Sequence, residues 1–170
     1  MNTASIKTYA YGFAEVKTYL FAIIFIVGNL ILPQLCHLMP SGGFIWLPIY
    51  FFTLIAAYKY GLKVGLLTAV LSPIANHLLF GMPMAGLLPI ILTKSILLAV
   101  AASMVAKKVQ GLSILWIALV VLSYQVVGTL VEWVIVKDFY VAIQDFRIGI
   151  PGMLIQVFGG YYLLRLIAKQ

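Results

Sequence analysis

Long apolar blocks, separated by short polar or Gly/Pro-containing stretches, occupy almost the whole of this chain. Roughly 20 apolar residues in a helix are enough to cross the hydrocarbon core of a bilayer, which is about 30 Å thick. The sequence predicts six such helices, over residues 18–36, 43–60, 62–80, 84–106, 112–136 and 148–167. The apolar runs do not alternate with period two, so helices are favoured over a β-barrel. We therefore predict an all-α membrane protein with one domain, residues 1–170, built as a six-helix transmembrane bundle.

Composition supports the membrane assignment and excludes other classes. Of the 170 residues, 64% are hydrophobic and 9% are charged, which is far from the composition of a typical soluble domain. The formal net charge is +7, but the charges are scattered singly between apolar blocks and form no basic stripe, so no nucleic-acid partner is expected. Little chain remains for a soluble domain, so any ATP-hydrolysing machinery would have to belong to a partner.

The positions of lysine and arginine predict the orientation, because cytoplasmic loops of membrane proteins are enriched in these residues. With the N-terminus inside, eight of the eleven basic residues fall on the cytoplasmic side: Lys7, Lys17, Lys59, Lys63, Lys107, Lys108, Arg165 and Lys169. Only Lys137 and Arg147 fall outside, in a loop where Asp138 and Asp145 offset them, and Lys94 remains within a helix. We predict that both termini are cytoplasmic.

The stretch Leu71–Pro83, LSPIANHLLFGMP, gathers polar and helix-disturbing residues within one apolar block. Pro73 removes a backbone hydrogen bond and is expected to bend or loosen the helix. Asn76 and His77 follow about one turn below the predicted external surface, where Gly81 to Pro83 turn the chain. A lone histidine is usually bonded to a neighbouring helix, but this neighbourhood favours the wall and rim of a solute pocket.

Lys94 lies near the middle of the fourth predicted helix, where a charged side chain is costly and usually faces the bundle interior or a wet cavity. It is interpreted as the partner of a substrate carboxylate or phosphate, or as a counter-ion for Glu132. The alternative is that its long side chain reaches an interface. Thr93 and Ser95 flank it and the nearest interface is about ten residues away, at 1.5 Å per residue, which favours a functional role.

A polar face is also predicted on the fifth helix. Tyr124, Gly128 and Glu132 recur at four-residue spacing, with Gln125 beside them, so they share one side of the helix. That side could form a pocket wall or an interhelical hydrogen-bonded seam. The full predicted ligand-binding set is His37, Trp46, Asn76, His77, Lys94, Tyr124, Gln125, Glu132 and Gln156.

Catalytic and metal-binding motifs are not apparent in the sequence. There is no helical nucleophile–base pair, Gly-rich phosphate loop, HExxH or paired-carboxylate motif, so we expect neither an enzyme nor a cofactor. Cys36, His37 and His77 could offer soft ligands, but two adjacent residues and one distant histidine do not make a recognised ligand spacing, so no metal site is expected.

Small residues near the N-terminus predict a surface for a partner. Ala10 and Ala14 form an AxxxA pattern, and the spacing continues loosely through Thr18 to Ala22. Small residues four apart create a groove in which another helix can pack closely. Ala10 and Ala14 precede the apolar core of the first helix and would lie at the cytoplasmic surface.

The six-helix plan and the stretch WLPIYFFTLIAAYKYGLKVGLLTAVLSPIANHLLFGMP, Trp46 to Pro83, together resemble the substrate-binding S components of energy-coupling factor (ECF) transporters. In that family a proline enters the second helix, a glycine pair marks the turn into the third, and a glycine and a proline close it. The matching residues here are Pro48, then Gly61 and Gly65, then Gly81 and Pro83. The resemblance covers the general plan of the chain, and its local pattern is confined to this stretch.

The resemblance implies a subunit of an ECF-type ABC importer in a prokaryotic cell membrane. Such a subunit captures a vitamin or related micronutrient near the external face, under a lid formed here by residues 33–43. Its cytoplasmic surface docks on a transmembrane coupling protein driven by two ATPases, partly through the alanine-spaced first helix, with Ala14, Thr18 and Ala22 as the alternative register. The competing hypotheses are a stand-alone small-solute transporter or channel, an integral membrane enzyme, and an assembly subunit without a ligand.

Overall fold

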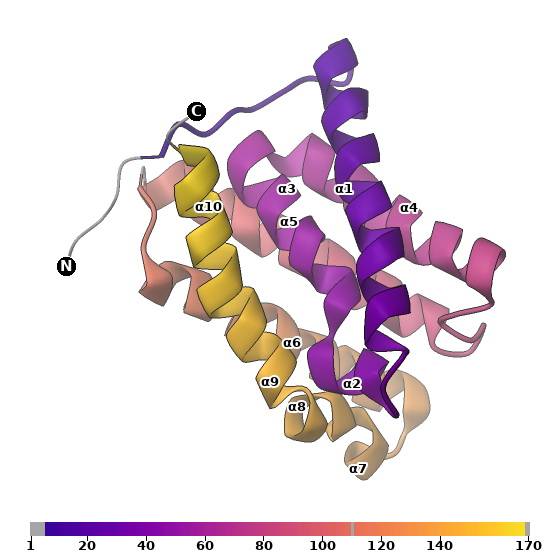
Figure 1. Cartoon of the computed structure of the whole chain (residues 1–170). Helices are drawn as coiled ribbons and strands as arrows, with labels where there is room; N and C mark the ends of the chain where they lie inside the picture. Colours follow the sequence, from indigo (N-terminus) through magenta and orange to yellow (C-terminus); the bar gives the residue numbers. More distant parts are fainter. Residues whose placement is uncertain (1–5, 110, 169–170) are drawn as a thin grey trace.

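The computed structural model describes residues 6–109 and 111–168, and within these ranges the chain is helical with no β-strand. The longest helices are α1 (Val16–Cys36), α4 (Leu62–Phe80), α5 (Leu88–Val109) and α6 (Ile114–Val136). Shorter elements are α2 (Gly42–Trp46), the 3-10 turn η1 (Pro48–Tyr50), α3 (Phe51–Tyr60), α7 (Phe139–Ala142), α8 (Gln144–Ile148), α9 (Ile150–Leu154), the π-helical η2 (Ile155–Gly159) and α10 (Gly160–Ala168). Figure 1 shows them as one bundle.

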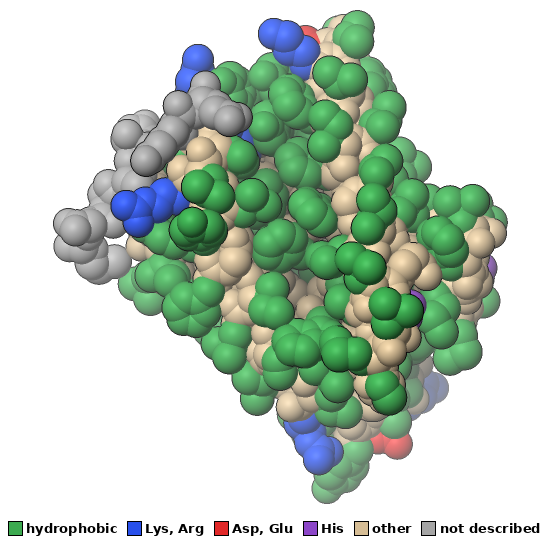
Figure 2. Space-filling model, in the orientation of Figure 1, with side chains coloured by type: hydrophobic (Ala, Val, Ile, Leu, Met, Phe, Trp, Pro, Cys, Tyr) green, Lys and Arg blue, Asp and Glu red, His purple; other side chains and the backbone are tan. Residues whose placement is uncertain are grey.

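Within residues 6–109 and 111–168, five helical stretches are long and apolar enough to cross a membrane: α1, α4, α5, α6 and Ile150–Ala168. Their outer faces are apolar as well. On α1 alone, Leu20, Ile23, Ile24 and Ile31 are all more than half exposed, and apolar side chains cover much of the face seen in Figure 2. A soluble monomer rarely exposes apolar surface of this kind. The prediction of an all-α, multi-pass membrane protein is confirmed at this level.

The predicted second helix, 43–60, is wrong as a continuous helix. The chain breaks between Leu47 and Pro48 into α2, η1 and α3. Proline has no N–H to donate, its ring clashes with the preceding turn, and it disfavours the helical conformation of the residue before it. Leu47 is not helical and adopts a left-handed conformation, with φ 46°. With ten residues, α3 is about 15 Å long, too short to cross a bilayer by itself.

The core of the bundle is α3, which is buried around its whole circumference. The five consecutive side chains from Leu54 to Tyr58 have no exposed surface, and α3 packs against α1, α4, α5 and α10. Contact with α4 is close at Gly65, where an added Cβ would lie 2.8 Å from the Cα of Ala57. The lack of a side chain at Gly65 therefore sets the separation of these two helices.

Helix boundaries elsewhere follow the prediction to different degrees. α4 occupies the predicted residues 62–80 and continues through Pro73. It ends at Gly81, whose φ of 68° is left-handed and whose N–H donates to the carbonyl oxygen of His77 at 2.9 Å. α5 begins at Leu88 instead of residue 84. Lys94 therefore lies six residues from the start of its helix, about 9 Å, and not ten residues from the nearest end.

Segments near both ends of the chain meet at the C-terminal end of α3. The N–H of Tyr9 donates to the carbonyl oxygen of Lys59 at 2.8 Å, and Lys59 Nζ donates to the carbonyl oxygen of Ile167 at 3.0 Å. The basic residues at this end are Lys7, Lys17, Lys59, Lys63, Lys107, Lys108 and Arg165. We call it the Lys-rich end; Lys169, predicted to belong to it, lies outside the described residues.

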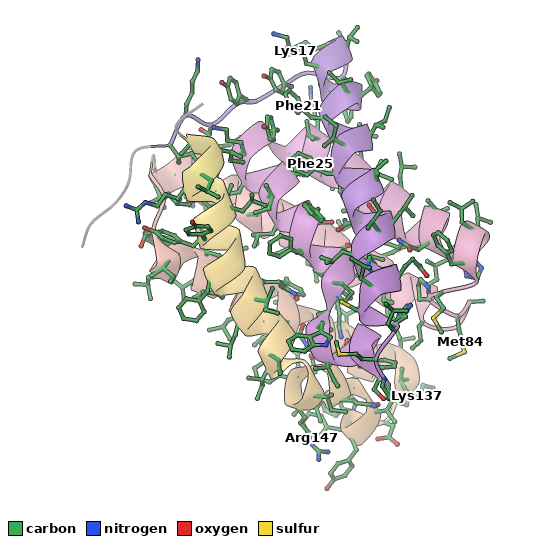
Figure 3. All side chains as sticks on the ribbon, viewed as in Figure 1. Lys17, Phe21, Phe25, Met84, Lys137 and Arg147 are labelled. Atoms are coloured by element: carbon green, nitrogen blue, oxygen red, sulfur yellow. The ribbon has the colours of Figure 1, made fainter. Side chains whose placement is uncertain are left out.

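The opposite end of the bundle is formed by residues 37–50, 81–87 and 137–149, and we call it the loop end. Lys137 and Arg147 lie here, far from Lys17 at the Lys-rich end (Figure 3). The charge asymmetry read from the sequence is therefore an asymmetry between two ends of one bundle.

Candidate functional site

A cavity of about 550 Å³ opens at the loop end. Small-molecule sites in proteins typically enclose about 300–1,000 Å³, with mainly apolar walls and a few polar groups. Here the wall comes from the end of α1, the loop after it, η1, the 82–91 segment and the 141–145 segment, and most of it is apolar. The polar side chains that reach the cavity include His37, Tyr50, Asn76, Glu132, Gln144 and Asp145.

A buried ion cluster forms one side of this cavity. Lys94 Nζ on α5 lies 2.6 Å from Glu132 Oε2 on α6 and 2.6 Å from Asp145 Oδ2 on α8. The Lys94 side chain is 1% exposed, and it lies behind the two carboxylates, which line the cavity. Buried charges are tolerated when they are paired. Lys94 is thus a counter-ion for Glu132, as one interpretation of the sequence had it, and the alternative that it reaches an interface is wrong.

Gly128 makes room for the lysine. A Cβ at this position would lie 2.5 Å from Lys94 Cγ, so the stem of the lysine passes over the bare backbone of α6. Tyr124, Gly128 and Glu132 were predicted to share an inward face, and all three are buried. On this face of α6, Gly128 therefore leaves space for the Lys94 side chain, and Glu132 supplies one of the carboxylates that pair with its ammonium.

Tyr124 and Gln156 support the cavity from behind. The hydroxyl of Tyr124 donates to Gln156 Oε1 at 2.9 Å, and Gln156 Nε2 donates to the carbonyl oxygen of Leu47 at 3.4 Å. The rings of Tyr50 and Tyr124 are 5.3 Å apart. These two predicted ligand residues hold Tyr50 and the break at Leu47 but do not line the cavity. Gln125 is fully buried outside the cavity lining, and its amide has no hydrogen-bond partner among the described residues.

Asn76 does line the cavity. Its Nδ2 donates to the carbonyl oxygens of Asn29 at 2.8 Å and Ser72 at 3.0 Å. Its Oδ1 accepts from Gln34 Nε2 at 3.4 Å. The side chain is therefore fixed in orientation by α1 and α4.

Asn29 continues this network into the core and was not anticipated from the sequence. Its Nδ2 donates to Thr53 Oγ1 at 3.1 Å and to Ser72 Oγ at 3.2 Å. Its Oδ1 accepts the backbone N–H of Phe52 at 3.3 Å, which is one of the first N–H groups of α3 and has no partner within that helix. Asn29 thus caps the helix that begins below the cavity.

Replacing Asn29 with Ala should lower the free energy of unfolding by about 1–2 kcal/mol, because it leaves buried donors and acceptors unpaired. Thermal unfolding of the purified protein in detergent measures this. Gln34→Ala is the control on the same helix, because Gln34 is half-buried and makes one long hydrogen bond. Gln34→Ala should lower the free energy of unfolding by less than Asn29→Ala does. An equal decrease in the two variants would contradict the capping role of Asn29.

The remaining predicted ligand residues have other positions. His77 does not line the cavity; its Nδ1 lies 2.7 Å from the carbonyl oxygen of Pro83, so it fixes the turn that follows α4. Trp46 is absent from the cavity lining, and its backbone packs on Gly152, where a Cβ would lie 2.5 Å from the Trp46 carbonyl oxygen. His37 is exposed at the rim.

The predicted partner-docking residues do not form one helical face. Ala10 and Ala14 precede α1 in non-helical chain and are exposed, so the AxxxA groove is not present. Thr18 and Ala22 are on α1 but are 0% and 2% exposed inside the bundle, and Thr18 Oγ1 donates to the carbonyl oxygen of Gly12 at 2.6 Å. Of this set, only the two alanines offer free surface.

Comparisons with family models, with curated proteins and with solved structures found no match. The function must therefore be inferred from the site itself.

The polar groups at the site that were not predicted from the sequence include Tyr50, Gln144 and Asp145. Asp145 was interpreted only as a charge that offsets Lys137 and Arg147 in a loop, whereas it folds back onto Lys94. The sequence did contain a signal for Asp145. A lysine inside a helix bundle needs a partner, and the chain has only four Asp and Glu residues in total, so each of them was a candidate partner for Lys94. Tyr50 is not among the residues that the sequence singles out, because no signal separates it from the chain's other aromatic residues. Among the described residues, no three His, Cys, Asp or Glu side chains gather as a metal site.

Proposed function

We propose that this chain is the membrane-embedded substrate-capture subunit of an ECF-type ABC importer, and that it binds a vitamin or related micronutrient from the external side. One observation carries the proposal: a cavity of about 550 Å³ at one end of an apolar bundle, with apolar walls and a fixed set of buried polar groups. Such a combination is typical of small-molecule sites. The resemblance of Trp46–Pro83 to the S-component pattern selects the family.

In this proposal the chain crosses the membrane six times, and the broken segment 42–60 is the second crossing. Non-helical backbone within a membrane is tolerated where it is buried in protein or lines a cavity, and η1 contributes Pro48 to Tyr50 to the cavity wall. The Lys-rich end faces the cytoplasm, following the enrichment of Lys and Arg in cytoplasmic loops. Both termini are then cytoplasmic, and the cavity faces outward from a prokaryotic cell membrane.

The loop after α1 serves as the lid. Residues 39–44 all line the cavity, so movement of this loop alone would change access to it. The coupling protein and its two ATPases dock at the Lys-rich end, where Ala10 and Ala14 are exposed. The chain itself performs no catalysis; ATP hydrolysis by the partners drives release of the solute.

Mass spectrometry of small molecules released from the purified protein tests capture. Leu87 lines the cavity, and Leu87→Trp should reduce the retained compound by roughly tenfold or more, because about 1.4 kcal/mol of lost affinity suffices for that factor. Leu119→Trp makes the same change on the exposed face of α6, where Leu119 is 45% exposed, and should retain the compound. Absence of any retained compound from the unmodified protein would favour an assembly subunit.

Reconstitution separates the importer from a stand-alone transporter. Liposomes that contain this chain alone should not accumulate the released compound. Co-expression of this chain with a coupling protein and two ATPases should yield a complex that purifies as one assembly. Solute flux through the chain alone would instead establish a self-contained transporter or channel, and conversion of the compound would establish an enzyme.

A further inference from the structure

We propose that the captured solute carries a cationic nitrogen, as a protonated amine or a heteroaromatic cation, and that Glu132 and Asp145 bind it. This inference rests on the proposed capture function and adds the chemical class of the substrate. It starts from the charge at the cavity wall: one ammonium, Lys94, and two carboxylates give a formal net charge of −1. No lysine or arginine among the described residues lines the cavity.

The carboxylates present unused acceptors to the cavity. Glu132 uses Oε2 and Asp145 uses Oδ2 to contact Lys94. Among the described residues, Glu132 Oε1 and Asp145 Oδ1 have no hydrogen-bond partner, although the Glu132 side chain is only 7% exposed. A carboxylate accepts several hydrogen bonds through its two oxygens. One open acceptor from α6 and one from α8 therefore border the same space, with no donor from the described part of the chain to satisfy them.

Tyr50 is a second, independent observation. It lines the cavity and is 2% exposed, yet its hydroxyl makes no hydrogen bond within residues 6–109 and 111–168. A buried tyrosine hydroxyl normally has a partner. The hydroxyl can accept from a cationic N–H, and the ring face attracts a cation. Contact between the ring and Tyr124 holds Tyr50 in place.

An anionic solute does not suit this wall. It would meet two carboxylates first, and like charges placed together at an interface disfavour binding. Lys94 cannot offset them, because it lies behind both and two of its three donors are already engaged. The sequence-based hypothesis that Lys94 binds a substrate carboxylate or phosphate is therefore replaced. The apolar wall, which includes Met82 and Ile90, suits the remainder of the solute, so the substrate combines a cationic nitrogen with an apolar or ring portion.

Charge-matched probes test the inference: tryptamine, tryptophol and indole-3-propionate share an indole ring and end in an ammonium, a hydroxyl and a carboxylate. Titration of the purified full-length chain at pH 7 should show tryptamine binding at least about tenfold more tightly than the other two, as expected for a hydrogen bond to a charged group. Glu132→Gln and Asp145→Asn should each remove most of this preference. Each single variant leaves Lys94 one carboxylate partner, so both are expected to fold.

Asp138→Asn is the matched control. It removes the same charge from the same loop, but Asp138 is exposed, and its Oδ1 accepts the N–H groups of Tyr140 and Val141 as the cap of α7. Asparagine caps helices as well as aspartate does. The preference of this variant for tryptamine over the other two probes should therefore stay within about twofold of the preference of the unmodified protein.

The outcomes separate this inference from the function on which it rests. Preference for tryptophol or indole-3-propionate, or equal binding of the three, would overturn the cation inference and leave capture standing. If none of the probes binds, the charge of the compound released from the purified protein decides: a cation supports the inference, and a neutral or anionic compound overturns it. If no probe binds and no compound is released, the capture function fails, and the inference fails with it.

Discussion

Lys94→Met is expected to lower the free energy of unfolding by about 3–5 kcal/mol, as measured when one member of a buried ion pair is removed. Glu132 and Asp145 each place an oxygen 2.6 Å from Lys94 Nζ. Without the ammonium, two carboxylates would share a poorly hydrated wall that no lysine or arginine of the described residues lines. Thermal unfolding in detergent, followed by circular dichroism, measures the change.

Two further variants make this result specific to the ion cluster. Lys107→Met changes the same residue type on the same helix, but Lys107 is exposed at the Lys-rich end, so its effect should stay within about 0.5 kcal/mol. The double variant Lys94→Met with Glu132→Gln should be more stable than Lys94→Met alone, because it removes one of the two uncompensated charges. A Lys94→Met protein that is as stable as the unmodified chain would show that the cluster is not held as ions.

Gly65→Leu is expected to lower the free energy of unfolding by about 3 kcal/mol, the upper part of the usual range for overpacking. A Cβ at Gly65 would lie 2.5 Å from the Cβ and 2.8 Å from the Cα of Ala57. The Cα belongs to the backbone in the buried middle of α3, and a backbone atom cannot move aside as the end of a flexible side chain could. Separation of α3 from α4 would be needed to fit the leucine, and it would loosen the core of the bundle.

Gly86→Leu provides the comparison for Gly65. A Cβ at Gly86 has no atom within 4 Å, so the same substitution should change the unfolding temperature little. Detergent thermal melts of the two variants, run side by side, measure the difference. Equal melting temperatures would mean that α3 and α4 are not in close contact at Gly65.

The parts of the fold that were predicted correctly depend on local signals. The predicted residues 62–80 coincide with α4 because a glycine stands at each boundary, Gly61 and Gly81, where the chain leaves helical geometry. The inward face of α6 follows from the four-residue spacing of Tyr124, Gly128 and Glu132. In both cases the residues that determine the feature lie within or next to one helix, so it can be predicted without knowing which helices pack against it.

The parts that were missed depend on contacts between distant segments. Pro48 was present in the sequence, but its consequence, a short α3 that needs Asn29 from α1 to cap it, requires two segments to be brought together. Asp145 is separated from Lys94 by 51 positions and lies in a stretch with no long helical repeat. Tyr124 was correctly expected to face inward, but its position behind the cavity wall depends on how α6 and η2 pack.

The short central helix also has a mechanical consequence. Tyr50, at the wall of the cavity, immediately precedes α3, and Lys59, which holds segments near both chain ends, is its penultimate residue. No glycine or proline interrupts residues 51–60, so the helix has no hinge between these points. α3 therefore behaves as a rigid rod about 15 Å long: a displacement of Tyr50 along the helix axis is transmitted to the contacts of Lys59 without a flexible joint to absorb it.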